Sequence, residues 1–364
     1  MKKKVKGSLA ITLAMLMCIG SITGCGKSAG ESGTAETTKE SVSEAKTESV
    51  TEAKTESVSE GGVEAPEDLK ATIGITFQDL SNEFVSNKKK ALMDYVSKNY
   101  PNIEVLYLDG AGDASTQVSQ METFINQGVD AIICNPQEST TLQPSYEKAI
   151  AAGIPVVSDG TDIDEKIGQV WSSCPDVPGA EEQVKYLMTL FPEDQTIDVA
   201  IMRGVIGHQA EIFRSEGYDN VMNENPDKFN IVFDQTANYS REEGLQLMEN
   251  WLSSGTHIDA VLAQNDEMAL GAVEAIKSAG KEDEIKVLGI DGIEDAVSGV
   301  KNGSLAATMF QDGTQIIINS FELAVKSIRG EEVSDIALSQ ELCTPENVDI
   351  YVEKLSYLAG LSGN

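Results

Sequence analysis

Histidine and cysteine are scarce in this 364-residue sequence, which contains two and five of them respectively. They do not recur at the spacings of metal ligands, so a metal centre is not expected. A glycine-rich dinucleotide-binding turn and a nucleophile elbow are also missing. The sequence therefore carries no motif of a metalloenzyme, a dinucleotide-dependent enzyme or a serine hydrolase, and it implies no cofactor.

Basic residues are few relative to acidic ones. The sequence has 27 Lys and Arg against 59 Asp and Glu, which gives a net charge of −32 at pH 7. Nucleic acids are gripped through their phosphates by Lys and Arg, so a nucleic-acid partner is not expected. This charge argues about partners and solubility and leaves the fold open.

A long hydrophobic run is missing as well, because the apolar stretch 8–20 is too short for a membrane span. It follows the basic segment 1–6 and precedes Ile22-Thr23-Gly24-Cys25, which resembles a bacterial lipobox. We expect residues 1–25 to be a lipoprotein signal peptide and Cys25 to carry lipid that anchors the protein outside the cytoplasmic membrane. The alternative is an ordinary secretory peptide with a chance cysteine.

The remaining cysteines do not suggest a disulfide framework. Once Cys18 leaves with the signal peptide and Cys25 is lipidated, an odd set remains: Cys134, Cys174 and Cys343. Cys134 ends an apolar run and is expected in the core. Whether any of these thiols pair stays open.

Residues 26–67 form a low-complexity segment with almost no large apolar side chains. Glu recurs at every fourth position from Glu36 to Glu64, so a helix would stack like charges along one face. Such a segment cannot offset the entropy of ordering it. We expect a disordered acidic tether.

From Lys70 onward, apolar strand patterns alternate with helical ones, which predicts parallel βαβ units with right-handed crossovers. Strands are predicted at 71–76, 103–108, 129–134, 154–159, 197–202, 229–235, 258–262, 285–291 and 305–310. Helices are predicted at 84–100, 115–127, 142–152, 178–191, 209–222, 242–252, directly after 265, at 293–301 and at 315–328. The fold class is α/β, with two doubly wound parallel-sheet lobes that together form one cleft.

The stretch Ala263–Gly271 shows how this fold places polar groups. It joins a strand to a helix, so Asn265 and Asp266 lie where ligands bind in open α/β sheets, at the carboxyl ends of the strands. Asp266 is also a good helix cap, and capping alone is an equal alternative for it.

Other strand ends carry similar groups: Asp159, Asp291 and Gln311 end or follow strands, and Arg214 lies early on a helix. Carboxylate, amide and guanidinium groups suit sugar hydroxyls, while Phe84 and Tyr239 offer aromatic area to the C–H faces of a sugar. Taken singly, each residue has an ordinary alternative: a surface salt bridge for Arg214, a turn for Asp291, and the core for the two aromatic residues.

Several segments together resemble a known family. Between Lys70 and Ile350 they are Asn82-Glu83-Phe84, Val157-Ser158-Asp159, Arg214–Tyr218, Ala263–Gly271, Leu288–Gly292 and Leu305–Gln311. In this order they resemble type I periplasmic sugar-binding proteins of the ribose-binding subfamily, which serve ABC transporters. The resemblance implies ligand contacts at Gln78, Asn82, Phe84, Asp159, Arg214, Tyr239, Asn265, Asp291 and Gln311.

Two positions depart from the ribose-binding pattern. Gly160 stands where these relatives have an arginine, and Val85 stands where they have a second aromatic residue. Losing the cation and the ring is expected to enlarge and reshape the pocket. A pyranose, a polyol or a small disaccharide is then as plausible as ribose.

The tryptophans and histidines are expected mostly outside the binding site. Trp171 is expected to pack near a crossover, with a contribution to the pocket as the alternative, and Trp251 lies on an apolar helical stripe. His208 opens a loop near Arg214 and is a minor candidate for ligand contact. His257 is expected on the surface.

The resemblance implies a non-enzymatic, monomeric solute-binding lipoprotein that captures a sugar or polyol and delivers it to an ABC permease. An alternative is a sensor of the same fold that signals to a membrane kinase or chemoreceptor. A glycosidase using Asp159 and Asp291 is disfavoured, because a neighbouring arginine keeps carboxylates ionised. The lobes are expected to be interleaved, with lobe 1 at 69–172 and 312–338 and lobe 2 at 173–311 and 339–359.

Overall fold

The computed structural model describes residues 69–362 of the chain. The predicted signal peptide, the lipidation site Cys25 and the tether 26–67 lie outside the described residues. No helix within 69–362 has the length and apolar composition that crossing a membrane requires.

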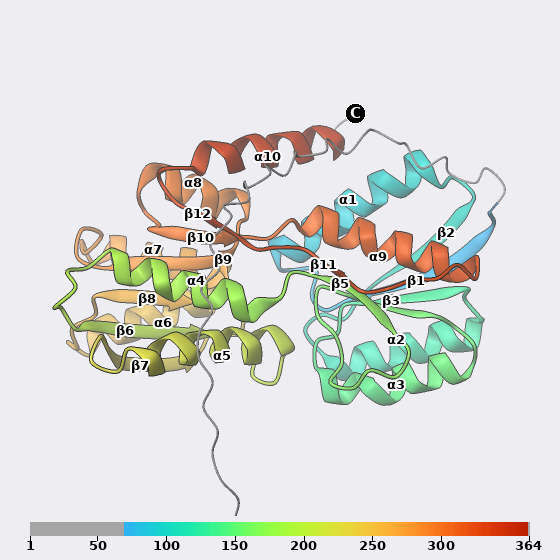
Figure 1. Ribbon diagram of the computed structural model, residues 1–364, viewed down its shortest axis with the longest axis horizontal. Helices are drawn as coiled ribbons and strands as arrows, with labels where there is room; N and C mark the ends of the chain where they lie inside the picture. The colour runs from blue at the N-terminus through green and yellow to red at the C-terminus, as the bar shows by residue number, and fades with distance from the viewer. Residues whose placement is uncertain (1–68, 363–364) are drawn as a thin grey trace, which may run out of the picture. The chain divides into compact units, whose positions relative to one another are not determined.

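Two six-stranded sheets form the body, one in each lobe (Figure 1). The lobe 1 sheet has the order β11-β5-β4-β3-β1-β2, and the lobe 2 sheet has the order β12-β10-β9-β8-β6-β7. The lobe 1 strands are β1 (Ala71–Phe77), β2 (Ile103–Asp109), β3 (Ala131–Cys134), β4 (Val156–Asp159), β5 (Val170–Ser173) and β11 (Ile336–Ala337). The lobe 2 strands are β6 (Ile197–Arg203), β7 (Phe229–Thr236), β8 (Ala260–Ala263), β9 (Lys286–Asp291), β10 (Ala307–Phe310) and β12 (Glu341–Cys343). All neighbouring strands are parallel except β10 and β12.

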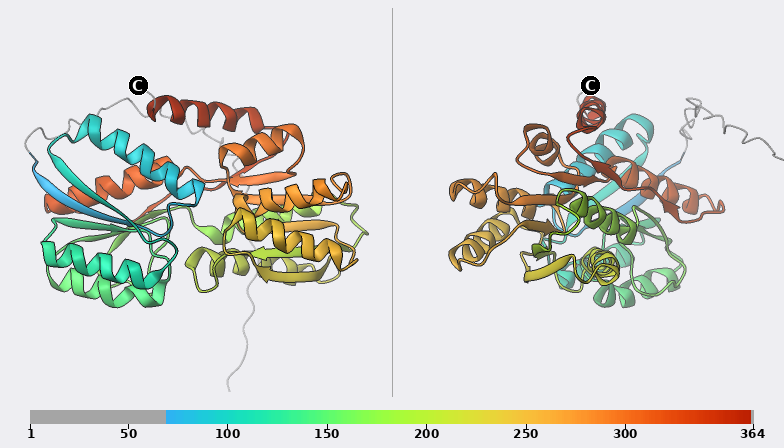
Figure 2. Two further views of the ribbon diagram at one scale, coloured as in Figure 1. Left: turned by 180° about the vertical axis from the view of Figure 1, so that it is seen from behind. Right: turned by 60° about the vertical axis from the view of Figure 1, so that its left-hand side comes forward.

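Helices cover both faces of each sheet. They are α1 (Glu83–Asn99), α2 (Ala114–Gln127), α3 (Ser139–Ala151), α4 (Asp176–Thr189), α5 (Gln209–Glu224), α6 (Arg241–Ser253), α7 (Asp266–Ser278), α8 (Glu294–Asn302), α9 (Gly313–Ile328) and α10 (Val348–Ser362). In lobe 1, α1 packs beside α9 and α2 packs beside α3, on opposite faces of the sheet (Figure 2). In lobe 2, α4 packs against α5, and α6 packs against α7.

The chain passes between the lobes more than once. Helix α4 follows β5 of lobe 1 but packs on α5 of lobe 2, and α9 follows β10 of lobe 2 but packs on α1 of lobe 1. The chain crosses again between β11 and β12, and α10 then contacts both α8 and α1. Each lobe is therefore built from separate stretches of sequence. The exact lobe boundaries given above remain a prediction.

The predicted fold class is confirmed, and every predicted strand and helix is present with ends within about three residues, the usual uncertainty of such boundaries. Central strands such as β3 and β8 are buried along their whole length because helices cover both faces of a parallel sheet. Strands β5, β11 and β12 and helix α10 were not predicted. Trp251 lies in the core of lobe 2 and His257 on its surface, as predicted. Cys134, Cys174 and Cys343 are buried free thiols.

Candidate functional site

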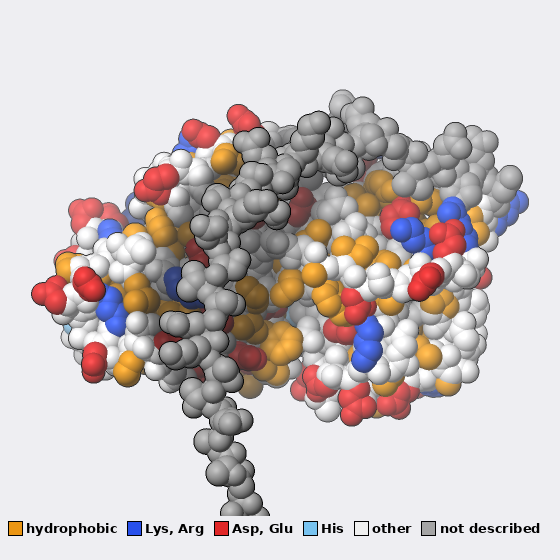
Figure 3. Space-filling model, in the orientation of Figure 1, with side chains coloured by type: hydrophobic (Ala, Val, Ile, Leu, Met, Phe, Trp, Pro, Cys, Tyr) orange, Lys and Arg blue, Asp and Glu red, His pale blue; other side chains and the backbone are white. Residues whose placement is uncertain are grey.

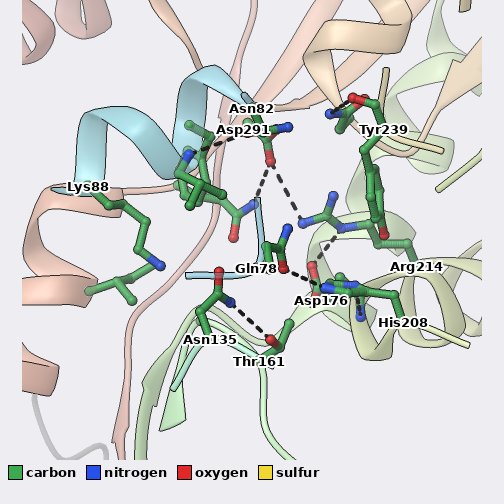
Figure 4. Close-up of a pocket in the computed structure, with 17 residues that line it drawn as sticks. Gln78, Asn82, Lys88, Asn135, Thr161, Asp176, His208, Arg214, Tyr239 and Asp291 are labelled. Atoms are coloured by element: carbon green, nitrogen blue, oxygen red, sulfur yellow. Dashed lines mark hydrogen bonds and ion pairs between the residues drawn. The ribbon is translucent and has the colours of Figure 1, made fainter. Parts of the chain in front are cut away.

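A cavity lies between the lobes, at the carboxyl ends of the strands of both sheets. Its empty space is about 520 Å³, which includes the open mouth. Its polar lining residues are Gln78, Asn82, Lys88, Asn135 and Thr161 from lobe 1, Asp176, His208, Arg214, Tyr239, Asn265 and Asp291 from lobe 2, and Gln311 at a crossover (Figure 4). Phe84, Val85, Ala210 and Ile316 add apolar surface.

Helix N-caps place three of these side chains. Asn82 begins α1 and accepts from the Val85 amide, and Asn265 begins α7 and accepts from the Met268 amide. His208 begins α5, where its Nδ1 accepts from the Ala210 amide. Because these helices follow β1, β8 and β6, their N-termini all lie at the strand ends that face the cavity.

His208 also joins the two lobes. Its Nε2 lies 2.8 Å from Oε1 of Gln78 across the cleft. Since Nδ1 accepts a hydrogen bond from the backbone, Nε2 carries the proton and donates to Gln78. Burial and the nearby Arg214 lower the pKa of His208 to about 3, so the imidazole is neutral. At the rim, Arg241 of lobe 2 lies 3.9 Å from Glu83 of lobe 1.

Arg214 is the buried cation of the lobe 2 wall, with 7% of its side chain exposed. Its Nε donates to Oδ1 of Asp176 at 2.7 Å, and Nη1 donates to the carbonyl of Gln264. Its Nη2 lies 3.8 Å from Oδ1 of Asp291. The guanidinium is therefore held by carboxylates on two sides, and the predicted alternative of a surface salt bridge is wrong.

Asp291 ends β9 and is buried beside Arg214. Gln311 Nε2 donates to its Oδ1 at 3.1 Å. Burial raises the pKa of Asp291 well above its usual range, Arg214 opposes this, and Asp266 and Asp176 add to it. A buried carboxyl with so few partners inside the protein has spare capacity for hydrogen bonds to a ligand.

Asp266 is hydrogen-bonded to the residues that follow Asp291 and to Thr308. Its Oδ2 accepts from the amides of Gly292 and Ile293 at 2.6 and 3.0 Å, and its Oδ1 accepts from Thr308 Oγ1 at 2.6 Å. These bonds fix the turn directly after Asp291. Asn265 is the cap of α7, so the alternative that Asp266 serves only as the helix cap is wrong. Unlike Asn265, Asp266 does not line the cavity.

Backbone strain is concentrated at the same wall. Tyr239 and Asp291 have φ values of 60° and 130°, which non-glycine residues rarely adopt. Such conformations cost about 1–3 kcal/mol each and cluster at binding sites. In addition, Tyr239 Oη and Asn135 Oδ1 are buried without a hydrogen-bond partner among the described residues. Both residues line the cavity, so these atoms are available to a ligand.

All of the predicted ligand-contact residues except Asp159 line the cavity. Asp159 lies behind the wall, where its Oδ2 is 2.6 Å from Nζ of Lys88 and its Oδ1 accepts from Ser320. The assignment of the cavity residues as ligand contacts stays a prediction. Residues that the prediction left out also line the cavity: Lys88, Asn135, Thr161 and Asp176, together with the minor candidate His208.

A possible metal-ligand cluster lies elsewhere. Within the described part of the chain, Asp198, His257 and Asp259 bring ligand atoms within 4.8 Å of one another. They lie near the amino ends of β6 and β8, whereas the cavity lies at the carboxyl ends. Asp259 already pairs with His257 and accepts from the Asp198 amide, so this cluster has no connection to the cavity.

Comparison with known proteins decides the family. Residues 73–332 match the model of the periplasmic binding protein domain. The chain belongs to the periplasmic binding protein family. It is 36% identical over 297 residues to the xylitol-binding protein of Mycolicibacterium smegmatis, covering 80% of this chain and 82% of that protein. It is 34% identical over 262 residues to the ribose import binding protein RbsB of Bacillus subtilis, covering 72% and 83%.

A solved structure gives the same result. The ABC transporter solute-binding protein of Bacillus halodurans, solved with bound myo-inositol, is 36% identical and superimposes with a TM-score of 0.73. The match covers 78% of this chain and 98% of that one. These relatives are binding proteins of sugar and polyol transport, and they are not enzymes. The predicted family and the prediction of a non-enzymatic binding protein are confirmed.

The surface agrees with the acidic composition. On the face that Figure 3 shows, Lys and Arg side chains are scattered among Asp and Glu side chains of both lobes. The described residues on this face form no broad basic patch of the kind that binds nucleic acid.

Proposed function

We propose that this protein captures one neutral sugar or polyol molecule in the cavity between its lobes and delivers it to an ABC importer. The observation that carries the proposal is the cavity lining: amide, hydroxyl, carboxylate and guanidinium groups from both lobes face one cavity. Hydroxyl groups of a ligand both donate and accept, so they match such a mixed set. Phe84 and Tyr239 offer aromatic area to its C–H faces.

The charge balance favours a neutral ligand over an acid. Arg214 pairs with Asp176 and lies near Asp291, and Lys88 pairs with Asp159. The described lining therefore has no positive charge without a carboxylate beside it. A carboxylate or phosphate ligand would add a negative charge to a buried site whose two cations are already paired with carboxylates. Burying such an unpaired charge costs free energy.

The relatives narrow the chemical class. The names of the two curated relatives refer to xylitol and to ribose, and the similar solved structure holds myo-inositol. We propose a ligand of this size, a pentose, a pentitol or a cyclitol. Support comes from the cavity lining, whose amide, hydroxyl and carboxylate groups match the many hydroxyls of such molecules.

Capture and release would use the hinge between the lobes. The contacts of Gln78 with His208 and of Glu83 with Arg241 join lobe 1 to lobe 2, and they require the lobes to be close together. Closure around a ligand by hinge bending is a common motion of two-lobed binding proteins. We propose that the closed monomer is the form that the permease recognises.

A thermal-shift screen of the purified protein tests the ligand class. The probes are D-ribose, xylitol and myo-inositol, with D-gluconate and D-ribose 5-phosphate as charged counterparts. A ligand at 100 times its Kd stabilises the folded state by about 2.7 kcal/mol, which is a clear rise in Tm. We expect a rise with at least one neutral probe and none with the charged ones. A rise with a charged probe alone would contradict the proposal.

Membrane anchoring is a separate part of the proposal. We propose that lipid on Cys25 holds the protein on the outer face of the cytoplasmic membrane, with residues 26–67 as a tether. Radiolabelled palmitate fed to cells that express the protein should label it, and Cys25→Ala should remove the label. Cys18→Ala is the matched control and should keep it. Label that survives Cys25→Ala would contradict the anchor.

A further inference from the structure

Lys88 is the most unusual group in the cavity wall. It lies on α1 one turn after Phe84, and only 2% of its side chain is exposed. Its Nζ is 2.6 Å from Oδ2 of Asp159, whose side chain is 1% exposed, and it lies 5.7 Å from the centre of the Phe84 ring. A buried lysine is rare unless it is paired, and this one is paired beside a binding cavity.

The glycine after Asp159 makes room for this ammonium group. Gly160 has a φ of 79°, and a Cβ atom at this position would lie 3.2 Å from Lys88 Nζ and 3.8 Å from Asn135 Nδ2. A larger side chain at position 160 would therefore compete with Lys88 for the same space. The sequence predicts that Gly160 deprives the site of a cation, but the structure places a cation from α1 there.

Lys88 has unused donors. An ammonium group has three N–H donors, and the ion pair with Asp159 does not use all of them. The others have no acceptor among the described residues. Since the side chain lines the cavity, a ligand there can accept from them.

An unused acceptor lies beside these donors. Asn135 uses its Nδ2 to donate to the carbonyl of Asp159 and to Oγ1 of Thr161, so its orientation is fixed. Its Oδ1 is buried and has no hydrogen-bond partner within the part of the chain that the structure describes. Figure 4 shows the Lys88 side chain pointing from α1 toward Asn135. Adjacent donor and acceptor groups match one hydroxyl group, which accepts from the ammonium and donates to the amide oxygen.

We propose that Lys88, held by Asp159 and given room by Gly160, donates a hydrogen bond to a hydroxyl of the ligand and is a specificity-determining residue of this cavity. This rests on the proposed function and adds a contact to it. Because the lysine is a compact charge on a flexible stem, it binds a single hydroxyl, whereas an arginine would span two. Loss of a hydrogen bond to a charged group weakens binding by about 10- to 100-fold.

The test measures Kd by calorimetry for D-ribose, xylitol and myo-inositol with the purified protein and three variants. Lys88→Met removes the donor but leaves Asp159 buried and unpaired, which destabilises the fold. The double variant Lys88→Met with Asp159→Asn removes both charges and keeps the measurement possible. Lys90→Met is the matched control, because Lys90 is an exposed lysine of the same helix.

We expect the Lys90→Met variant to bind like the parent and the double variant to bind about 10- to 100-fold more weakly. A folded double variant with the parent's Kd overturns the role of Lys88 and leaves the proposed function standing. A parent protein that binds none of the three probes overturns the proposed function, and the role of Lys88 with it.

Discussion

His208 donates from Nε2 to Oε1 of Gln78 at 2.8 Å, and this hydrogen bond links lobe 2 to lobe 1 across the candidate binding cavity. Both residues line the cavity, so the bond forms where a ligand would be enclosed. It depends on a neutral imidazole, because Nδ1 accepts from the Ala210 amide at the same time. This arrangement couples the protonation of one buried side chain to the closed state of the cleft.

The first prediction concerns pH. Burial and Arg214 lower the pKa of His208 from 6.5 to about 3. Between these two pH values the imidazole is protonated in the unfolded chain and neutral in the folded protein. Stability contributed by this group is complete above pH 6.5 and falls as the pH drops toward 3. At pH 5 the loss is on the order of 1–2 kcal/mol.

Urea unfolding between pH 7.5 and pH 4.5 measures this effect against His208→Asn, which keeps a capping side chain at the start of α5. Other titrating groups are common to both proteins, so the difference between the two curves isolates His208. We expect the parent to lose stability faster than the variant below pH 6.5. Parallel curves would show that the imidazole titrates normally.

The second prediction compares two glycines with nearly the same φ. Gly160 and Gly153 have φ values of 79° and 80°, but a Cβ at Gly153 has no atom within 4 Å, whereas one at Gly160 lies 3.2 Å from Lys88 Nζ. Each substitution by alanine should cost about 1–2 kcal/mol of stability through strain alone. Only Gly160→Ala should also weaken binding of the neutral probes, measured by calorimetry. Equal Kd values in both variants would contradict this.

The third prediction concerns Asp266, which accepts from the amides of Gly292 and Ile293 and from the hydroxyl of Thr308. Asp266→Ala leaves the Ile293 amide and the Thr308 hydroxyl unpaired and leaves the Gly292 amide with only Thr308 Oγ1 at 3.3 Å. The substitution should cost about 3 kcal/mol of unfolding free energy. Thr308→Val removes one of them and should cost about 1 kcal/mol. Denaturant unfolding gives both values. A loss in Asp266→Ala no larger than in Thr308→Val would show that the carboxylate does not hold the turn.

Much of the fold follows from hydrophobic periodicity. The long buried strands and amphipathic helices were predictable because helices cover both faces of each sheet, so the apolar pattern is strong. The strands β5, β11 and β12 contain four, two and three residues. The two shortest carry almost no pattern of their own. β5 is as long as β3 and β8 but is half polar and only partly buried, so its apolar pattern is weak.

The site was predictable where strand ends and family resemblance point to it, as for Asn265 and Asp291. Lys88 was missed because it is the first of the consecutive Lys88, Lys89 and Lys90, which look like a solvated helix face. Its partner Asp159 lies 71 positions away, and only the fold brings the two together. Asn135 directly follows a predicted strand. Because ligands bind at the carboxyl ends of strands in such sheets, Asn135 could have been predicted as a site residue in the same way.

Calorimetric titration of the parent and of Asp291→Asn with D-ribose, xylitol and myo-inositol tests the central claim, binding of a neutral polyol between the lobes, most directly. Asp349→Asn, a change at an 81% exposed side chain, is the control.

The parent and the control should bind at least one probe with the same Kd. Asp291→Asn should bind it at least about 10-fold more weakly. Its stability should stay unchanged or rise, because burial beside Asp266 and Asp176 disfavours the Asp291 charge. Binding by Asp291→Asn with the parent's Kd would contradict the account.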